Sequence, residues 1–490
     1  MAYRIGLFLL LCMCSLPGRA QLPPVKHPKL PAEELKQDLH LLKDILEANH
    51  PSLYWYTSRE ELDSLFSVTL SGIKDSMSEL QFKNRVSAYI SRIRCGHTSV
   101  QSSRAYIKVA AKDKFPLFPL AIKVWADSMV VLANYNSKDS TLRRGTKLLS
   151  LNGRNAQSFI DTFSAHISGD GYGKQFASQL VSSNFGNYYK NILGLDSLYQ
   201  VAYINAAGER ADTILKNLMP ADFNLEKKVA ATPIKPPSKR QIRKSQLADR
   251  RSLQIDTATK TAFMRLSSFS GAGTGQFIRK SFRTINQASV NNLVIDLRTN
   301  GGGSVKNSTL LTRYLSDHAF RIADTVARPT HTIRYKKYIQ QAWAYQLLFL
   351  FSNSKREDGK YHFRRFEKKV WQPLEKNHFG GDVFLVQGGY SFSAATLVLG
   401  ELKGQKNVRL LGEETGGAYY GNSAMMIPSI TLPNSKLRIS LPLYRLVINN
   451  SRPKGVGVVP DIPVPPSSEA IKRGVDPKID RIRLLISGSK

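Results

Sequence analysis

Three short apolar runs in the second half of the chain most strongly limit what it can fold into. They span residues 293–297, 383–386 and 408–411, and each is rich in Val, Leu and Ile. Segments with helical spacing of apolar residues separate them. Short strands that are apolar on both faces and alternate with helices are typical of a largely parallel sheet covered by helices. The sequence therefore predicts an α/β layer over residues 256–466.

The first half of the chain divides into two regions of different periodicity. Residues 21–114 are expected to form helices, because leucines recur at helical spacing between positions 35 and 46. Ser58 and Ser78 are each followed three residues later by Glu or Gln, a pattern that predicts helix N-termini. Residues 115–225 switch to strand signals, with alternating apolar residues and an Asn-Gly turn. We therefore expect helices first and a β-rich unit second.

The two ends of the chain and one internal stretch have distinct compositions. Residues 1–20 contain a basic start, a short apolar run and small residues, which predicts a cleaved secretory signal. We expect export to the periplasm, the cell envelope or the medium; an uncleaved anchor and a lipoprotein are the alternatives. No later apolar stretch is long enough to cross a bilayer, so no transmembrane anchor is expected. Residues 226–255 are rich in Lys, Arg and Pro, which predicts a linker, and residues 467–490 are read as a C-terminal tail.

The chain is strongly basic, with 70 Lys and Arg against 37 Asp and Glu. Such a balance favours anionic partners, among them acidic peptides and polymers of the cell envelope. A solvated basic surface is the simpler interpretation. No nucleic acid is expected as a partner, because no nucleic-acid-binding motif accompanies the charge.

Two serines follow the second apolar run, between a Gly-Gly turn and a helical pattern that begins at Ala394. A serine at the start of a helix lies at the positive end of the helix dipole, and the amide of Ala394 would point toward an oxyanion there. This pattern is compatible with a nucleophile at Ser393, or at Ser391 instead. Serine also caps helices, and local sequence alone favours that structural role.

Two further stretches carry candidate chemistry. The first apolar run continues into Gly301, Gly302 and Gly303, whose amides could approach an anion without obstruction from side chains. His97 follows Gly96 in a loop after a predicted helix and is a candidate general base. His50 is a competing histidine. Cys95 is expected to fill the core rather than to act as a nucleophile.

Taken together, four stretches in order resemble the tail-specific, or C-terminal-processing, serine peptidases, a family with a tricorn-like branch and a retinoid-binding branch. They are LVIDLRTNGGG at 293–303, FLVQGGYSFSAATLVLGELK at 384–403, VRLLGEETGG at 408–417 and GVGVVPDIPV at 455–464. The stretches NHPSLYWYTSREEL and RCGHTSV are similar to the N-terminal part of exported bacterial members. Residues 142–153 resemble a conserved stretch of PDZ domains. The resemblance implies a crotonase-like catalytic core with a PDZ-like module and an N-terminal helical region.

The resemblance also implies roles for individual residues. The family's nucleophile corresponds to Ser393, and its oxyanion-binding amides correspond to Gly302 and Ala394. No lysine lies between Lys406 and Lys436, where the processing branch has its base, whereas His97 matches the histidine of the tricorn-like branch. The residue that orients His97 stays open among three candidates: Thr98, Glu413 and Glu414.

The expected activity is hydrolysis of peptide bonds in a peptide or protein substrate, through an acyl-enzyme on Ser393 and without a metal or organic cofactor. The first alternative is a catalytically inactive peptidase fold that binds a peptide or a hydrophobic ligand. The second is a protein that binds an envelope polymer through the basic stretch 227–251. The sequence indicates neither the cleavage preference nor the oligomeric state.

Overall fold

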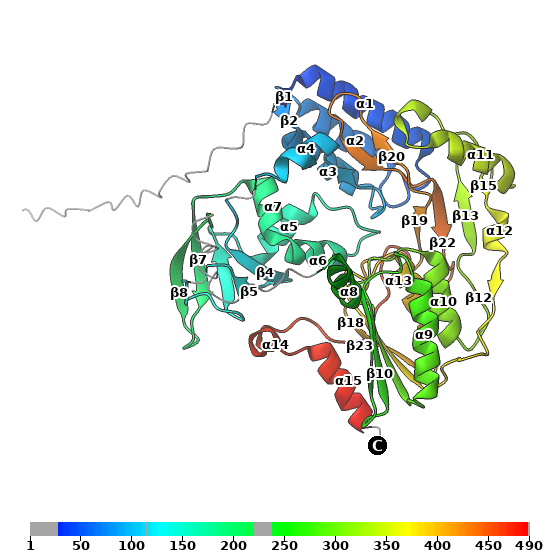
Figure 1. Cartoon of the computed structure of the whole chain (residues 1–490). Helices are drawn as coiled ribbons and strands as arrows, with labels where there is room; N and C mark the ends of the chain where they lie inside the picture. The colour runs from blue at the N-terminus through cyan, green and yellow to red at the C-terminus, as the bar shows by residue number, and fades with distance from the viewer. Residues whose placement is uncertain (1–27, 114–115, 137, 220–237, 489–490) are drawn as a thin grey trace, which may run out of the picture.

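The computed structural model describes residues 28–113, 116–136, 138–219 and 238–488 (Figure 1). The expected signal segment 1–20 lies outside the described residues, as does the part of the expected linker up to residue 237. Among the helices that the structure describes, none combines the length and the apolar character needed to span a bilayer.

A six-stranded sheet forms the centre of the second half, in the order β23-β18-β17-β11-β10-β9. Its neighbouring strands run parallel, except that β9 is antiparallel to β10. The strands are β9 Arg251–Asp256, β10 Thr261–Leu266, β11 Asn292–Asp296, β17 Asp382–Gln387, β18 Val408–Gly412 and β23 Ile462–Pro463. The three predicted apolar runs are β11, β17 and β18, which confirms the expected α/β layer.

Helices cover both faces of this sheet. On one face, α9 Thr274–Gln287, α10 Val305–Leu315 and α13 Ala394–Leu402 pack in one apolar core with alternate residues of the strands. On the other face lies α15 Pro477–Gly488 (Figure 1). Its Ile482 is fully buried against apolar residues of β11, β17 and β18. Burial on both faces explains why the central strands are apolar throughout rather than alternating.

The expected linker and the expected C-terminal tail both contain regular secondary structure. The expected linker 226–255 contains α8 Lys239–Arg250, and β9 then pairs with β10 through backbone hydrogen bonds. Arg, Lys, Gln and Leu are good helix formers, so positive charge alone does not prevent a helix there. The expected tail 467–490 contains α14 Ser468–Arg473 and α15, whose few isoleucines and leucines cover an otherwise open face of the sheet. The expectation that the linker would not fold is therefore wrong for residues 239–255, and the expected C-terminal tail contains two helices.

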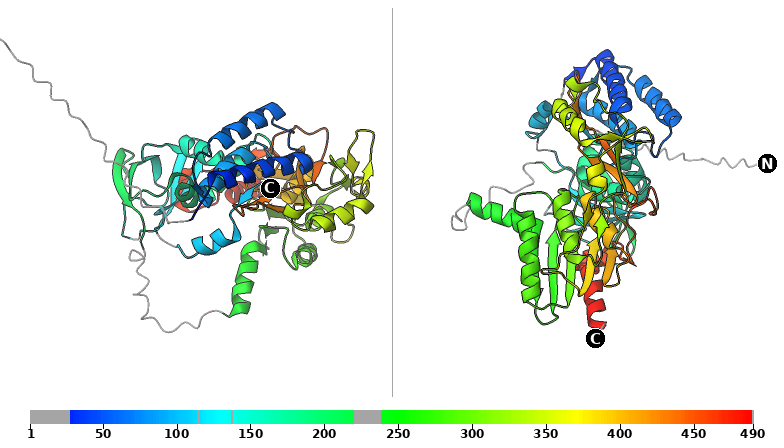
Figure 2. Two further views of the ribbon diagram at one scale, coloured as in Figure 1. Left: turned by 90° about the horizontal axis from the view of Figure 1, so that it is seen from above. Right: turned by 90° about the vertical axis from the view of Figure 1, so that its right-hand side faces the viewer.

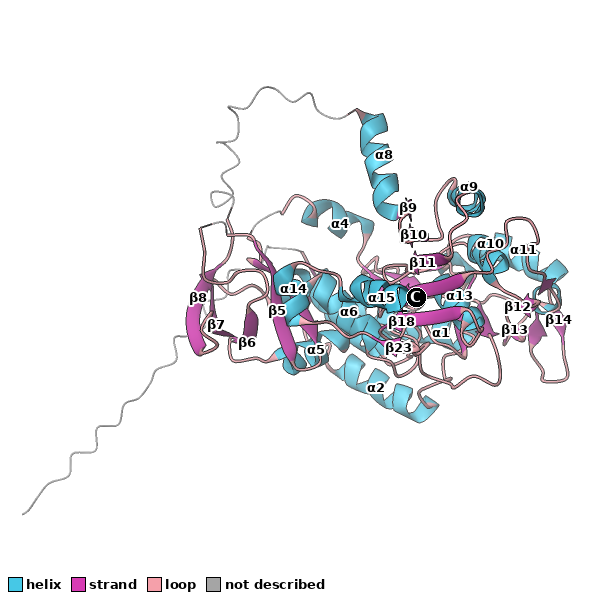
Figure 3. Cartoon of the chain, turned by 90° about the horizontal axis from the view of Figure 1, so that it is seen from below, coloured by secondary structure: helices cyan, strands magenta, loops and turns pink. Residues whose placement is uncertain are grey.

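A separate antiparallel sheet lies at the other side of the molecule, in the order β4-β5-β6-β7-β8 (Figure 3). Its strands are β4 Leu120–Trp125, β5 Ser128–Asn134, β6 Lys147–Leu151, β7 Leu198–Ile204 and β8 Arg210–Lys216. The helices α5 Ala156–Ser164, α6 Gln175–Ser183 and α7 Phe185–Tyr188 and the π-helical turn Tyr189–Leu193 pack on it. The strand signals of residues 115–225 are thus confirmed, and the unit has its own apolar core.

The N-terminal helices have no core of their own. They are α1 Ala32–Asn49, α2 Arg59–Ser71, α3 Glu79–Ser91 and α4 Arg104–Ala110. The buried faces of α1, α2 and α3, which include Leu39 and Phe82, share one apolar core with residues between 323 and 446. Figure 2 shows the N-terminal helices beside these later segments. Ser78 forms the predicted capping box with Gln81 at the start of α3. The first and last parts of the chain therefore fold as one body, which brings loops from both to the same place.

The remaining elements complete that shared body. A five-stranded sheet has the order β14-β15-β13-β22-β19, a three-stranded sheet has the order β20-β21-β3, and two small strand pairs are β1-β2 and β12-β16. The strands are β1 Lys29–Leu30, β2 Met77–Ser78, β3 Val100–Gln101, β12 Phe320–Arg321, β13 Thr325–Arg328, β14 Ser354–Lys355, β15 Tyr361–His362, β16 Val370–Trp371, β19 Gly421–Met425, β20 Ser429–Thr431, β21 Arg438–Ser440 and β22 Tyr444–Val447. The helices are the 3-10 turn η3 Lys336–Tyr338, α11 Ala342–Ser352 and α12 Arg364–Glu367.

Candidate active site

The two candidate serines lie in the turn between β17 and α13, and the structure gives them different roles. The buried hydroxyl of Ser391 donates to the carbonyl of Leu297 at 2.8 Å and accepts from the amide of Gly388 at 3.2 Å. It thereby ties the ends of β11 and β17 together. Ser393 is half-buried and makes no side-chain cap hydrogen bond to α13. The capping role that local sequence favours is therefore not the one that Ser393 has.

The backbone of Ser393 is strained. Its φ and ψ angles are 53° and −119°, a region that residues with a side chain rarely occupy. Such strain persists only where the surrounding structure enforces it, and it is common at functional sites. It places a serine at the N-terminus of α13, whose first amide, that of Ala394, has no acceptor inside its own helix. A hydroxyl and an amide without an acceptor in its own helix thus stand side by side.

The glycine-rich loop after β11 packs directly against Ser393. A Cβ atom at Gly302 would lie 2.7 Å from Cβ of Ser393 and 3.0 Å from the amide nitrogen of Ala394, so only glycine permits this approach. The amide of Gly302, however, donates to Oδ1 of Asn300 at 2.8 Å, and Nδ2 of this buried Asn300 donates to the carbonyl of Leu266. In this arrangement the amide of Gly302 is engaged by Asn300, and its expected oxyanion-binding role stays a prediction.

His97 reaches this turn from the loop after α3. Its side chain is 10% exposed, and its ring lies 5.1 Å from the ring of Phe392, the residue before Ser393. A Cβ atom at Gly96 would lie 2.4 Å from Cζ of Phe392, so a glycine there lets the loop approach. Neither ring nitrogen of His97 has a hydrogen-bond partner among the described residues. The structure thus brings two predicted site residues, almost three hundred positions apart, to the same place.

A carboxylate that the sequence analysis did not single out lies beside His97. Oδ1 of Asp170 is 3.7 Å from Nδ1 of His97 and accepts the amide hydrogen of Gly96 at 2.8 Å. Asp170 is buried, and its Oδ2 has no partner among the described residues. The amide of Gly171 donates to the carbonyl of Arg94, and the amide of Tyr172 donates to the carbonyl of Gly455. Two other segments, around residues 94–96 and at Gly455, therefore hold the Asp170 loop in place.

Residues 260–464 match the family model of peptidase family S41. This part of the chain is a peptidase family S41 segment. The matched segment contains Ser393 and the glycine-rich loop but neither His97 nor Asp170. Family S41 membership is the coarser part of what the sequence resemblance implied, and it is confirmed.

Solved structures resemble this S41 chain over most of its length. Mature CPAF matches with a TM-score of 0.60 and 14% identity, over 90% of this chain and 94% of that one. Mature CPAF complexed with lactacystin matches with a TM-score of 0.62 and 13% identity, over 93% and 98%. A putative peptidase from Parabacteroides merdae matches with a TM-score of 0.47 and 12% identity, over 93% and 97%. No curated protein matches the chain significantly. At these identities the CPAF structures show a shared fold.

The three residues expected to orient His97 in this S41 site are engaged elsewhere. The hydroxyl of Thr98 lies 2.8 Å from Nε2 of His50. Glu413 forms an ion pair with Lys478 of α15, and Glu414 accepts the amide hydrogen of Gly457 at 2.7 Å. Asp170 is therefore the carboxylate best placed to orient His97. Its signal in the sequence is an acidic residue between two glycines, Gly169 and Gly171, within the stretch assigned to the β-rich unit.

His50, the competing histidine, is part of the core. It is buried, and its Nδ1 accepts the amide hydrogen of Ser52 at 3.1 Å, so Nε2 carries the proton and donates to Thr98. Burial lowers the pKa of His50 to about 3. The ring therefore stays neutral in the folded protein, and it cannot exchange a proton with Ser393 from this position.

The lowered pKa of His50 predicts a loss of stability in acid. An unfolded histidine binds a proton below about pH 6.5, whereas the folded one does not until about pH 3, so the unfolded state binds more protons in that window. His50 should therefore cost about 1.4 kcal/mol of unfolding free energy per pH unit as pH falls below about 6.5. Urea unfolding of the wild type and of His50→Gln should show a pH slope that is smaller in the variant. Equal slopes would contradict the neutral, buried state.

Cys95 lies close to the site without being suited to its chemistry. Sγ of Cys95 and ligand atoms of His97 and Asp170 all lie within 4.8 Å of one another, a grouping that could in principle hold a metal ion. Burial, with a further contribution from the charge of Asp170, raises the pKa of the Cys95 thiol to about 12. A thiol ligates metals and attacks carbonyls as the thiolate, so this one is poorly suited to either role. We assign Cys95 to the core, as the sequence analysis expected.

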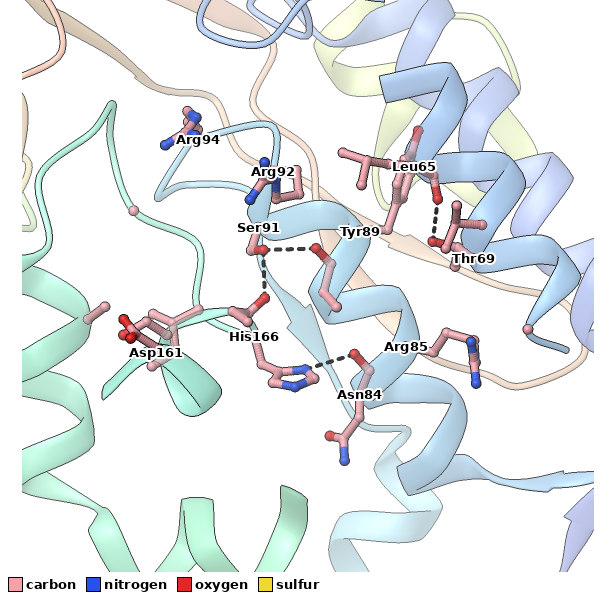
Figure 4. A pocket seen from close by; sticks show the side chains of 18 of the residues that line it. Leu65, Thr69, Asn84, Arg85, Tyr89, Ser91, Arg92, Arg94, Asp161 and His166 are labelled. Carbon is pink, nitrogen blue, oxygen red and sulfur yellow. Dashed lines mark hydrogen bonds between the residues drawn. The ribbon is translucent and has the colours of Figure 1, made fainter. Parts of the chain in front are cut away.

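A cleft of about 1320 Å³ borders the Asp170 loop of this S41 protein. It lies between α2 and α3 on one side and residues 160–177 on the other (Figure 4). Two contacts bridge its floor: Ser91 Oγ donates to the carbonyl of Ala165, and Nδ1 of His166 lies 3.0 Å from the carbonyl of Asn84. Its charged lining residues are mostly cationic, with Lys29, Lys74, Arg85, Arg92, Arg94 and Lys174 against Asp75 and Asp161.

Proposed function

We propose that this chain is a serine peptidase that hydrolyses peptide bonds through an acyl-enzyme on Ser393. One observation carries the proposal: a strained, uncapped Ser393 stands at the N-terminus of α13, directly after Phe392, whose ring lies 5.1 Å from the ring of His97. In an S41 chain, a hydroxyl, an imidazole and a buried carboxylate at one point support nucleophilic catalysis with a general base.

The proposed reaction proceeds in two halves. His97 takes the hydroxyl proton of Ser393 while Oγ bonds to the substrate carbonyl carbon, and the carbonyl oxygen becomes an oxyanion that the amide of Ala394 binds. The imidazolium then gives its proton to the leaving amine as the peptide bond breaks. Water repeats the sequence on the acyl-enzyme and releases the new carboxyl terminus. Gly302 permits the close approach of its loop, and its amide becomes a second donor only if it turns away from Asn300.

We further propose that Asp170 orients His97 and stabilises the imidazolium. Their 3.7 Å separation is longer than a hydrogen bond, which normally ends near 3.2 Å for N–H···O. Catalytic hydrogen bonds are often long without substrate and shorten in the reactive complex. Because Asp170 is buried and Oδ2 has no described partner, its charge is poorly compensated until His97 becomes positive.

The finer architecture is also part of the proposal. The parallel sheet with its flanking helices fits a crotonase-like catalytic core, and the antiparallel unit of residues 115–225 fits a PDZ-like module. The cationic cleft beside that unit lies against the loop that holds Asp170, so a polypeptide could extend from the site into it. Acidic segments of a protein substrate would suit its lining. Export of the chain remains a proposal that rests on residues 1–20.

Digestion of an unfolded acidic protein tests this proposal. We expect the purified chain to release soluble fragments from fluorescently labelled casein, and we expect prior treatment with a fluorophosphonate to stop the release. The alternative function is a peptidase fold that only binds, and the occupied amide of Gly302 is the observation that favours it. Retention of casein without any cleavage, by a folded protein, would support that alternative and contradict the proposal.

A further inference from the structure

The helix α11, Ala342–Ser352, exposes an unusual amount of apolar surface. Trp343 is 73% exposed and Phe351 is 85% exposed, and Leu347, Leu348 and Leu350 are exposed between them. No polar residue interrupts this exposed face, which we call the α11 apolar face. Soluble proteins rarely leave so many large apolar side chains together in water, and such patches commonly mark interaction surfaces.

The opposite side of α11 is firmly attached to the body of the protein. Ala342 and Phe349 are buried, and the guanidinium of the buried Arg328 lies 3.5 Å from the centre of the Phe349 ring. The side chain of Gln346 bonds to the backbone of Ile333 and of His331. The helix is therefore held with its apolar face outward, and Figure 1 shows it at the outer edge of the molecule.

Positive charge surrounds the helix on both sides in the sequence. Exposed cations precede it in and near η3 and follow it in β14, in α12 and just beyond: Arg334, Lys336, Lys337, Lys355, Arg356, Arg364, Arg365, Lys368 and Lys369. The exposed acids of the same stretch are Glu357 and Asp358. Apart from Arg356, which pairs with Glu367, none of these cations forms an ion pair with a residue that the structure describes. The segments with these cations lie beside α11 in Figures 1 and 3.

We propose that the α11 apolar face docks the protein on an anionic lipid surface. Tryptophan, phenylalanine and leucine suit the boundary between headgroups and acyl chains, and lysine and arginine around them suit anionic headgroups. A second copy of the chain is a poorer occupant, because a symmetric contact through this face would bring two basic rims together. The proposal concerns a surface separate from the candidate active site and does not depend on the proposed function.

Vesicle binding tests the proposal. We expect the wild type to co-sediment with phosphatidylglycerol-containing vesicles more strongly than with phosphatidylcholine vesicles, and less at high salt because salt screens the charges. Trp343→Ser with Phe351→Ser should lower the partition coefficient about tenfold or more, since two large apolar side chains no longer insert. Arg364→Glu with Arg365→Glu should lower binding to the anionic vesicles to a similar degree.

A control changes two exposed apolar residues elsewhere. Val68 of α2 and Ile214 of β8 are 65% and 63% exposed, so Val68→Ser with Ile214→Ser removes exposed apolar surface outside α11 and should leave vesicle binding unchanged. Absence of wild-type binding to anionic vesicles, or an equal loss in this control, would overturn the proposal. Sedimentation equilibrium adds a third outcome: a dimer that the α11 double variant abolishes would assign the face to a second copy instead.

Discussion

Replacing Ser393 with alanine should lower the turnover of a peptide substrate by about 10⁴-fold or more. The expected reason is the loss of the oxygen that bonds to the substrate carbonyl, for which no neighbouring group substitutes. The side chain of Ser393 makes no cap hydrogen bond, so its removal should leave the unfolding free energy within about 0.5 kcal/mol of the wild type. Initial rates on a fluorogenic peptide, with thermal unfolding measured in parallel, check both expectations.

Ser391→Ala is the matched control for that prediction. It removes a hydroxyl of the same kind two residues away, but this hydroxyl is buried and bonded to Leu297 and Gly388. We expect a loss of about 1–3 kcal/mol in unfolding free energy, because buried donors and acceptors lose their partner, and retention of measurable turnover. The reverse pattern, with activity surviving Ser393→Ala and lost in a folded Ser391→Ala, would move the nucleophile to Ser391.

Replacing Asp170 with asparagine should lower kcat by about 10²- to 10⁴-fold with little change in KM. The amide keeps the size of the side chain, but it removes the negative charge that stabilises the imidazolium. The reaction with a fluorophosphonate should slow by a similar factor, since it also needs His97 as a base. Stopped assays at saturating peptide, with the second-order labelling rate alongside, separate this role from a purely structural one.

Thr98→Val is the matched control, because Thr98 adjoins His97 in the sequence but lies against His50. Its turnover should remain within about tenfold of the wild type, since it alters packing around His50 rather than the charge beside His97. A large loss in Thr98→Val together with normal kcat in Asp170→Asn would return the orienting role to a residue that the sequence analysis favoured. A similar, moderate loss of turnover in both variants would indicate that the loop around His97 contributes through its conformation rather than through the charge of Asp170.

Much of the fold could be predicted because apolar periodicity reports local structure directly. The spacing of apolar residues alone predicts the strands at 293–297, 383–386 and 408–411. It also predicts the first helix, whose buried face includes Leu35 and Leu39. Periodicity indicates which face is buried but not what covers it. The sharing of one core between the N-terminal helices and residues 323–446, and the packing of Ile482 on the sheet, therefore lay beyond the sequence pattern.

The candidate site likewise contains residues that the sequence could indicate and residues that it could not. Ser393 and His97 could be singled out because each belongs to a recognisable stretch, and the structure adds that both meet at Phe392. Asp170 could not, because an acidic residue between glycines resembles an ordinary turn. The backbone bonds of Gly171 and Tyr172 to distant segments, together with the bond from the amide of Gly96 to the carboxylate, bring Asp170 to His97. The occupied amide of Gly302 depends likewise on the orientation of one side chain, that of Asn300.

The central claim is that Ser393 is a nucleophile activated by His97, and covalent labelling tests it most directly. The folded protein would be treated with a fluorophosphonate and examined by intact mass and peptide mapping, with Ser393→Ala and His97→Ala beside it. We predict one adduct, located on Ser393, that is absent from Ser393→Ala and formed at least about 10²-fold more slowly in His97→Ala. An adduct on another residue, or a wild type that stays unlabelled while folded, would contradict the account.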